Sequence, residues 1–96
     1  MEKLDRDELT ERMADNLPVL RKKLRLSQDQ LAAMIGSTRF TIMQIETKKR
    51  KMTWQMFMLL ALVFEKNKDT SVLIRALDIY SDDLEQLIVK DFERER

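Results

Sequence analysis

Positively charged side chains gather in one stretch of this chain, between residues 20 and 51. The stretch holds nine Lys or Arg against two carboxylates, a net charge of +7 (nine minus two). Residues 1–19 sum to −3 (three minus six) and residues 52–96 also to −3 (six minus nine), which leaves the total at +1. Clustered positive charge is typical of a surface that binds phosphate groups. The nine cations are Arg21, Lys22, Lys23, Arg25, Arg39, Lys48, Lys49, Arg50 and Lys51.

The residue types that catalysis and metal binding use most are missing. The chain has no His and no Cys, which removes the commonest general base, the commonest metal ligand and all thiolate chemistry. Its single Gly cannot build a glycine-rich loop around a phosphate. We therefore expect that the protein is not an enzyme, that it has no catalytic residue and that it binds neither a metal nor a cofactor. Carboxylates such as Asp82, Asp83 and Glu85 are interpreted as charges at the start of a helix.

Length and composition predict one all-helical domain over residues 1–96. The chain is 44% apolar but has only one Gly and one Pro, so turn formers are scarce, and only 6% of its residues are aromatic. Ninety-six residues suffice for a single hydrophobic core. Neither a signal peptide nor an apolar span of membrane length occurs, so we expect a soluble, cytoplasmic protein with no membrane partner.

The N-terminal third predicts two short helices. Residues 5–15 form an acidic one, with Leu9 and Met13 one turn apart, and residues 17–25 form another. Pro18 predicts a break or kink near residues 15–17, and Asn16 is the expected N-cap of the second helix.

The basic stretch itself predicts two helices joined by a tight turn. Ser27 and Gln30 have the form of a capping box, which opens a helix that reaches about residue 35. Gly36 suits the left-handed position that ends such a helix, and Ser37 or Thr38 caps the next one, about residues 38–47. The basic loop 48–51 follows.

The remaining residues predict three helices. Thr53 caps a helix at 54–64 in which ten of eleven residues are apolar, so it must be covered on more than one side, by the C-terminal helices or by a second chain. Two further helices are expected at 71–80 and 82–94, with Ser81 as the cap between them and an apolar face that continues to Phe92.

Residues 20–64 resemble the Cro/repressor-type helix-turn-helix family, the XRE or lambda-repressor-like DNA-binding domains. The resemblance is carried by Leu-Ser-Gln at 26–28, Leu-Ala at 31–32, Gly36, Ile42, Ile-Glu at 45–46, the basic loop and the apolar helix from Trp54. It implies a five-helix domain, here with extra N- and C-terminal helices, whose third helix enters the DNA major groove. Residues 16–66 would form the DNA-binding core and residues 70–96 the C-terminal helices, a candidate dimerisation region. Arg25 and Lys48 stand where the family usually has Gly.

The resemblance also implies roles for individual side chains. Base contacts are expected from Thr38, Arg39, Phe40 and Gln44. Arg39 can pair with guanine and Gln44 with adenine, while Phe40 can pack on thymine methyl groups or, alternatively, against Met43 or a neighbouring element. Phosphate contacts are expected from Gln28, Lys48, Lys49, Arg50 and Lys51, although Gln28 and the basic run can also be merely solvated. Arg21 and Glu46 are expected to form a structural salt bridge.

Two functional hypotheses remain open. The first is a sequence-specific transcriptional regulator, a repressor, that binds double-stranded DNA at a pseudo-palindromic operator as a homodimer, because one short helix reads only a few base pairs. The second is an antitoxin-like or other protein-interaction module that uses the same fold. Copurification of a stable protein partner would favour the second hypothesis.

Overall fold

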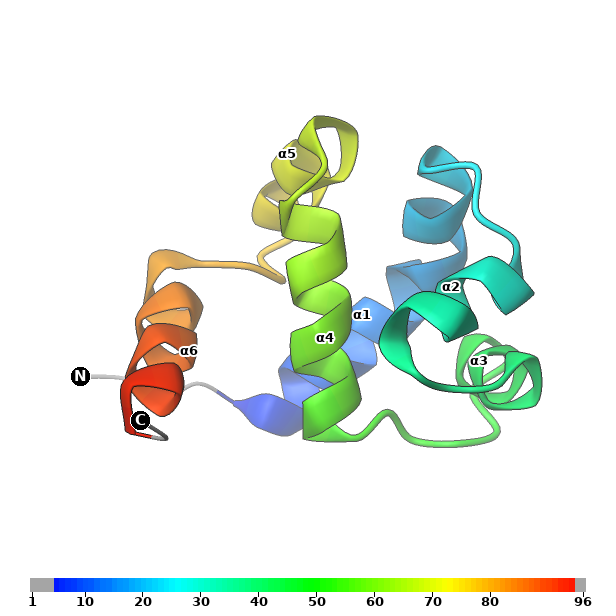
Figure 1. The fold of residues 1–96 in the computed structure, drawn as a ribbon, viewed down its shortest axis with the longest axis horizontal. Coiled ribbons are helices and arrows are strands. Elements are labelled where there is room, and N and C mark those ends of the chain that lie inside the picture. The colour runs from blue at the N-terminus through cyan, green and yellow to red at the C-terminus, as the bar shows by residue number, and fades with distance from the viewer. Residues whose placement is uncertain (1–4, 95–96) are drawn as a thin grey trace.

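Six helices run through residues 5–94, the part of the chain that the computed structural model describes (Figure 1). No strand occurs among these residues, so the described part of the chain is all-helical, as the composition predicts. The helices are α1 (Arg6–Lys23), α2 (Gln28–Ile35), α3 (Arg39–Glu46), α4 (Trp54–Glu65), α5 (Lys68–Ala76) and α6 (Asp82–Arg94).

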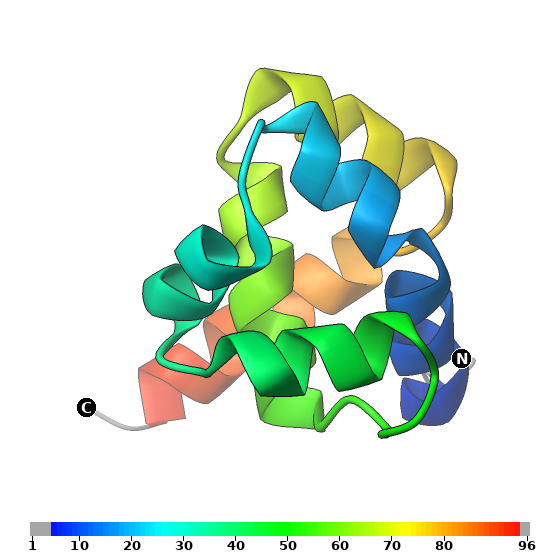
Figure 2. The same ribbon diagram turned by 90° about the vertical axis from the view of Figure 1, so that its right-hand side faces the viewer.

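The two helices predicted in the N-terminal third are one helix, α1, with Pro18 inside it. The expected kink is present, since α1 changes direction along its length in both views (Figures 1 and 2). The expected separation into two helices is wrong, because Met13 and Leu17 before the proline and Leu20 after it are all fully buried. Asn16 is not an N-cap; its side-chain amide donates to the carbonyl of Arg12 at 2.8 Å.

Helix α4 is covered on most sides by the helices of its own chain. Phe57, Leu60 and Phe64 are fully buried, and α1, α2 and α5 all contact this helix. Within α4, Leu59 is the one exposed large apolar side chain, with an exposed fraction of 45%. The unusual apolar content of this segment is therefore accounted for mainly by a central position in the chain's own core.

Helix α5 begins three residues earlier than predicted, at Lys68, and ends at Ala76 rather than residue 80. The early start is held by Thr70, whose buried hydroxyl donates to the carbonyl of Phe64 at 2.6 Å. The early end coincides with Asp78, whose φ of +58° lies in the left-handed region and cannot continue a right-handed helix.

Helix α6 begins where it was expected. The Ser81 hydroxyl accepts a hydrogen bond from the N–H of Leu84 at 3.2 Å, which confirms the predicted cap. Leu84 and Ile88 are buried in the core. Phe92, predicted to continue this apolar face, lies outside the residues whose side chains the structure describes. No helix within residues 5–94 has both the length and the apolar character that crossing a membrane requires.

Candidate nucleic-acid interface

Helices α2 and α3 pack on each other through buried apolar side chains. Leu31 and Ala32 of α2 and Ile42 and Ile45 of α3 are all at most 2% exposed. Gly36 makes the turn between the two helices: its φ is +70°, the left-handed conformation expected for it, and its N–H bonds to the carbonyl of Ala32.

The start of each helix in this pair is capped as predicted. The Ser27 hydroxyl accepts from the N–H of Gln30 at 3.0 Å, and the Gln30 side chain accepts from the N–H of Ser27 at 2.8 Å, which completes the capping box. At the start of α3, the Thr38 hydroxyl accepts from the N–H of Thr41 at 3.2 Å. Local hydrogen bonds therefore determine where α2 and α3 begin.

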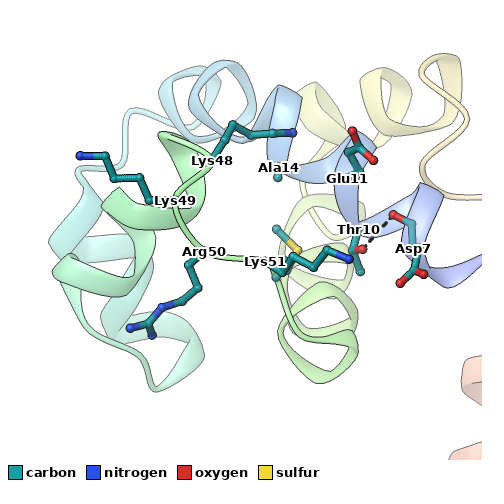
Figure 3. A pocket seen from close by; sticks show the side chains of 9 residues that line it. Asp7, Thr10, Glu11, Ala14, Lys48, Lys49, Arg50 and Lys51 are labelled. Carbon is teal, nitrogen blue, oxygen red and sulfur yellow. Dashed lines mark hydrogen bonds between the residues drawn. The ribbon is translucent and has the colours of Figure 1, made fainter.

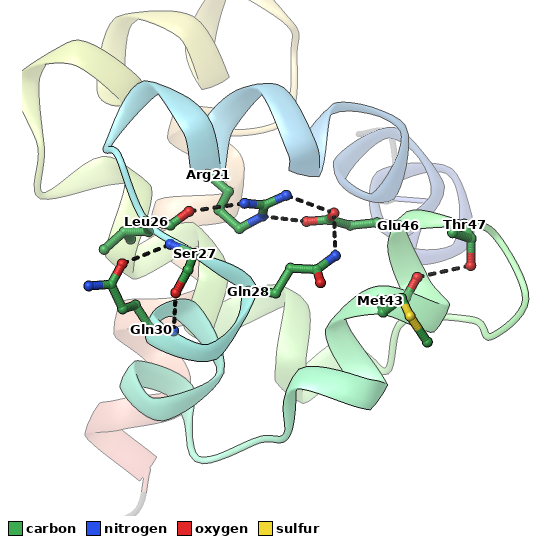
Figure 4. Close-up of polar contacts among 8 residues, drawn as sticks. All are labelled: Arg21, Leu26, Ser27, Gln28, Gln30, Met43, Glu46 and Thr47. Atoms are coloured by element: carbon green, nitrogen blue, oxygen red, sulfur yellow. Dashed lines mark hydrogen bonds and ion pairs between the residues drawn. The ribbon is translucent and has the colours of Figure 1, made fainter.

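Glu46, at the end of α3, ties this helix to α1 and α2 (Figure 4). Its two carboxylate oxygens accept from Nε and a terminal nitrogen of Arg21 at 2.8 and 3.0 Å. The side chains of Arg21 and Glu46 are only 11% and 7% exposed, so the predicted salt bridge is present and largely buried. Arg21 also donates to the carbonyl of Leu26 at 3.0 Å, which fixes the turn before α2.

Gln28 belongs to the same network, a role that the sequence did not suggest. Its amide nitrogen donates to Glu46 at 3.1 Å, and Gln28 is half-buried. Its backbone N–H is the first of α2 and, like every first-turn N–H, has no acceptor within its own helix. A phosphate contact by Gln28 would therefore use this backbone group while the side-chain amide nitrogen holds α3 in place.

Two turns that flank the α2–α3 pair adopt left-handed backbone conformations without glycine. The φ of Arg25 is +58° and that of Lys48 is +64°. These are the two positions at which the helix-turn-helix family usually has Gly. A non-Gly residue in this conformation costs about 1 kcal/mol, and both side chains lie exposed at the surface.

The outward face of α3 lies open across the front of the molecule in Figure 2. Arg39 is exposed at the first position of this helix, and Phe40 is 57% exposed next to it. Met43, one turn further on, is 38% exposed. Thr38 is exposed too, but its hydroxyl is already engaged with the backbone and side chain of Thr41.

Gln44 does not join this outward face as predicted. The residue is half-buried, and its side-chain oxygen is buried without a hydrogen-bond donor among the described residues. A paired contact with adenine uses both the oxygen and the nitrogen of a glutamine amide. The conformation of Gln44 in the structure does not offer both atoms, because packing at the end of α3 covers one of them.

The four cations of the basic loop divide into two pairs (Figure 3). Lys48 forms an ion pair with Asp15 of α1, and Lys51 extends toward Thr10 on the same helix. Lys49 and Arg50 point away from α1, and Arg50 donates to the Thr41 hydroxyl of α3 at 3.2 Å. Lys49 and Arg50 are thus the cations of this loop that are directed away from the acidic helix.

An acidic row on α1 lies on the side toward which Lys48 and Lys51 extend. Asp7, Glu11 and Asp15 are spaced four residues apart, which places them on one helix face, and all three are exposed. Asp7 and Glu11 line a shallow pocket together with the basic loop. The spacing was visible in the sequence, but the approach of this face to a loop more than thirty residues away was not.

Within residues 5–94, no group of acidic, His or Cys side chains is arranged to hold a metal ion. Comparison with known proteins adds no assignment: no family model matches the chain, and neither the curated proteins nor the solved structures contain a significant match.

Proposed function

We propose that this chain is a sequence-specific DNA-binding transcriptional regulator, a repressor built on a lambda-repressor-like helix-turn-helix domain. In this proposal α2 and α3 are the helix-turn-helix, and the leading end of α3 enters the major groove. The observation that carries the proposal is the open outward face of α3, with Arg39 and Phe40 at its leading end and Lys49 and Arg50 after its other end.

The dimensions of α3 suit this role. An α-helix with its side chains is about 10–12 Å in diameter, which the major groove of B-form DNA, about 12 Å wide, admits. The network of Arg21, Gln28 and Glu46 keeps α3 at a fixed orientation relative to α1 and α2, so its exposed side chains need no rearrangement to be presented together.

Arg39 is the leading candidate for a base contact. Its guanidinium can donate two hydrogen bonds to O6 and N7 of guanine. Phe40 is the second candidate, through apolar contact with a thymine methyl group. Thr38 contributes less to base recognition in this proposal, because its hydroxyl caps α3. Gln44 would have to change its side-chain conformation before it could contact a base, because its side-chain oxygen is buried.

Phosphate contacts are expected mainly from Lys49 and Arg50, together with the first N–H of α2 at Gln28. Lys48 and Lys51 contribute less in this proposal, because Lys48 is paired with Asp15 and Lys51 extends toward α1. Contacts of this kind set the position of the protein on the duplex without choosing a sequence.

The regulator is proposed to act as a homodimer. A single short helix reads only a few base pairs, whereas two copies place their helices about 34 Å apart, one DNA turn, on a pseudo-palindromic site. Among the exposed apolar side chains outside α3, Leu59, Val72 and Val89 on α4, α5 and α6 offer surface for such an interface. Sedimentation at micromolar concentration tests this part, and a monomer both free and on DNA would overturn it.

Selection from a pool of randomised duplexes tests the function itself. The retained sequences should share one motif with two related halves, bound on the order of 10³-fold or more tighter than random duplex. Retention without any enriched motif would reduce the proposal to non-specific binding, and no retention at low salt would overturn it.

The same exposed Leu59, Val72 and Val89 support a second candidate, an antitoxin-like module whose C-terminal helices bind a different protein. This candidate predicts a stable heteromeric complex on copurification. Substituting Val72 and Val89 by Ser should dissolve that complex.

A further inference from the structure

Two large apolar side chains lie together on the outward face of α3. Phe40 is 57% exposed and Met43 38%, and residues three apart are neighbours on a helix surface. Thr47, four residues after Met43, extends this row, since its hydroxyl donates back to the Met43 carbonyl at 2.9 Å (Figure 4). Thr47 is exposed, and its methyl group is the part of the side chain that has no polar partner. We call Phe40, Met43 and Thr47 the apolar ridge.

Cations lie at both ends of the apolar ridge. Arg39 precedes it on α3, and Lys49 and Arg50 follow it. The partner that this pattern fits carries negative charge on both sides and apolar groups between. Duplex DNA has this arrangement in its major groove, where the 5-methyl group of thymine is the one apolar group on a base edge, between two phosphate strands.

We infer that the apolar ridge recognises the 5-methyl group of pyrimidines, so that the target of this chain is a duplex with thymine, or 5-methylcytosine, at the positions facing Phe40 and Met43. The inference rests on the proposed function and specifies the bases that it reads. Met43 becomes a specificity-determining residue next to Phe40.

Contact with a methyl group distinguishes bases that present the same hydrogen-bonding groups. Deoxyuridine presents the same O4 acceptor as thymidine and differs by that single methyl group. Burial of one methyl group corresponds to about fourfold in affinity. Duplex RNA is excluded for a further reason, because its deep and narrow major groove does not admit a helix.

The test uses the duplex that is retained from the randomised pool. Two versions of this duplex are compared, which carry either thymidine or deoxyuridine at one position at a time. Wild-type protein should bind the deoxyuridine version about fourfold more weakly at each position that the ridge contacts and equally at the others. Fluorescence anisotropy at constant salt gives both affinities.

The variant Phe40→Ala/Met43→Ala should bind the two versions equally. Each single variant should lose the preference for thymidine only at the positions that its own side chain contacts. Both side chains are exposed, so their truncation leaves the core intact. Val19→Ala, an exposed apolar truncation on α1, is the matched control and should keep the fourfold difference.

Equal affinity of the wild-type protein for both versions would overturn the inference while the proposed function stands. A difference that persists in the double variant would overturn it as well, since the methyl contact would then lie elsewhere. Failure to retain any duplex would overturn the inference together with the proposed function, and would point to a protein as the partner of the ridge.

Discussion

Glu46 joins three helices through one carboxylate. It accepts hydrogen bonds from Arg21 of α1 and Gln28 of α2 while it belongs to α3. Because the pair with Arg21 is largely buried, removal of either charge leaves the other without compensation away from water. The contribution of this residue is thus to the relative orientation of the helices that would present the base-reading side chains.

Substitution of Glu46 by Ala should lower the free energy of unfolding by about 3 kcal/mol, the usual cost of leaving a buried charge unpaired. Urea unfolding followed by circular dichroism measures it. Glu8→Ala is the matched control, since the pair of Glu8 with Arg12 is on the surface and should change stability by less than about 1 kcal/mol. Equal stability of wild type and Glu46→Ala would contradict the role given to this network.

Arg25 holds a conformation that glycine adopts without strain, at φ +58°. Arg25→Gly should therefore raise the free energy of unfolding by about 0.5 kcal/mol, the relief of strain being partly offset by the greater freedom of glycine in the unfolded chain. The same urea unfolding experiment shows whether the free energy of unfolding of Arg25→Gly rises or falls. A loss of stability would mean that the Arg25 side chain contributes a contact larger than the strain.

At the scale of helices, local signals were readable from the sequence and long-range ones were not. The capping residues Ser27, Thr38, Thr53 and Ser81 were predicted correctly because each bonds to an N–H within three residues. Gly36 was predictable because the left-handed backbone conformation that ends α2 favours glycine.

The errors arose where tertiary contacts outweigh local preference. Pro18 lacks one backbone hydrogen bond, yet burial on both sides of it keeps α1 in one piece. Thr70 begins α5 early through a bond to Phe64 on the preceding helix. In the candidate site, neither the pairing of Lys48 with Asp15 nor the covered oxygen of Gln44 has a signal in the local sequence.

The stability that Glu65 of α4 contributes through its contacts with α5 should depend on pH. Burial alone would raise the pKa of Glu65, but hydrogen bonds from Arg75 and Ser71 and the charge of Arg75 outweigh it and lower that pKa below its ordinary value of 4.5. A lowered pKa in the folded state stabilises the fold above pH 4.5, and this contribution is lost as the pH falls through the folded value.

Glu65→Gln should therefore lower the Tm at neutral pH, and the difference from wild type should shrink as the pH falls below 4.5. Thermal unfolding over a pH series measures this. Asp83→Asn, at an exposed position in the first turn of α6, serves as the comparison. A Tm difference for Glu65→Gln that stays constant with pH would contradict the assignment.

At the scale of the whole molecule, negatively charged side chains of one helix face positively charged side chains of a loop. The acidic row of α1 faces the basic loop on one side, and the outward face of α3 with Lys49 and Arg50 lies on the other. The net charge of +1 therefore conceals a cationic surface whose extent is limited by the chain's own carboxylates.

This arrangement predicts unequal salt effects within the basic loop. Lys49→Ala and Arg50→Ala should each reduce the slope of log affinity against log salt by about one unit, because each removes a phosphate contact. Lys48→Ala and Lys51→Ala should change the slope less, because Lys48 is paired with Asp15 and Lys51 extends toward α1. Equal effects of all four substitutions would contradict the division of the loop.

The most direct test of the central claim is a binding titration of the duplex retained from the randomised pool, beside a scrambled duplex of the same composition. The wild-type protein should prefer the retained duplex on the order of 10³-fold. Arg39→Ala should lose about 1–3 kcal/mol of that preference with little change in affinity for the scrambled duplex. Lys66→Ala, which removes an exposed cation at the end of α4, should keep the preference. Equal affinity of the wild-type protein for the two duplexes would contradict the claim that α3 reads base sequence.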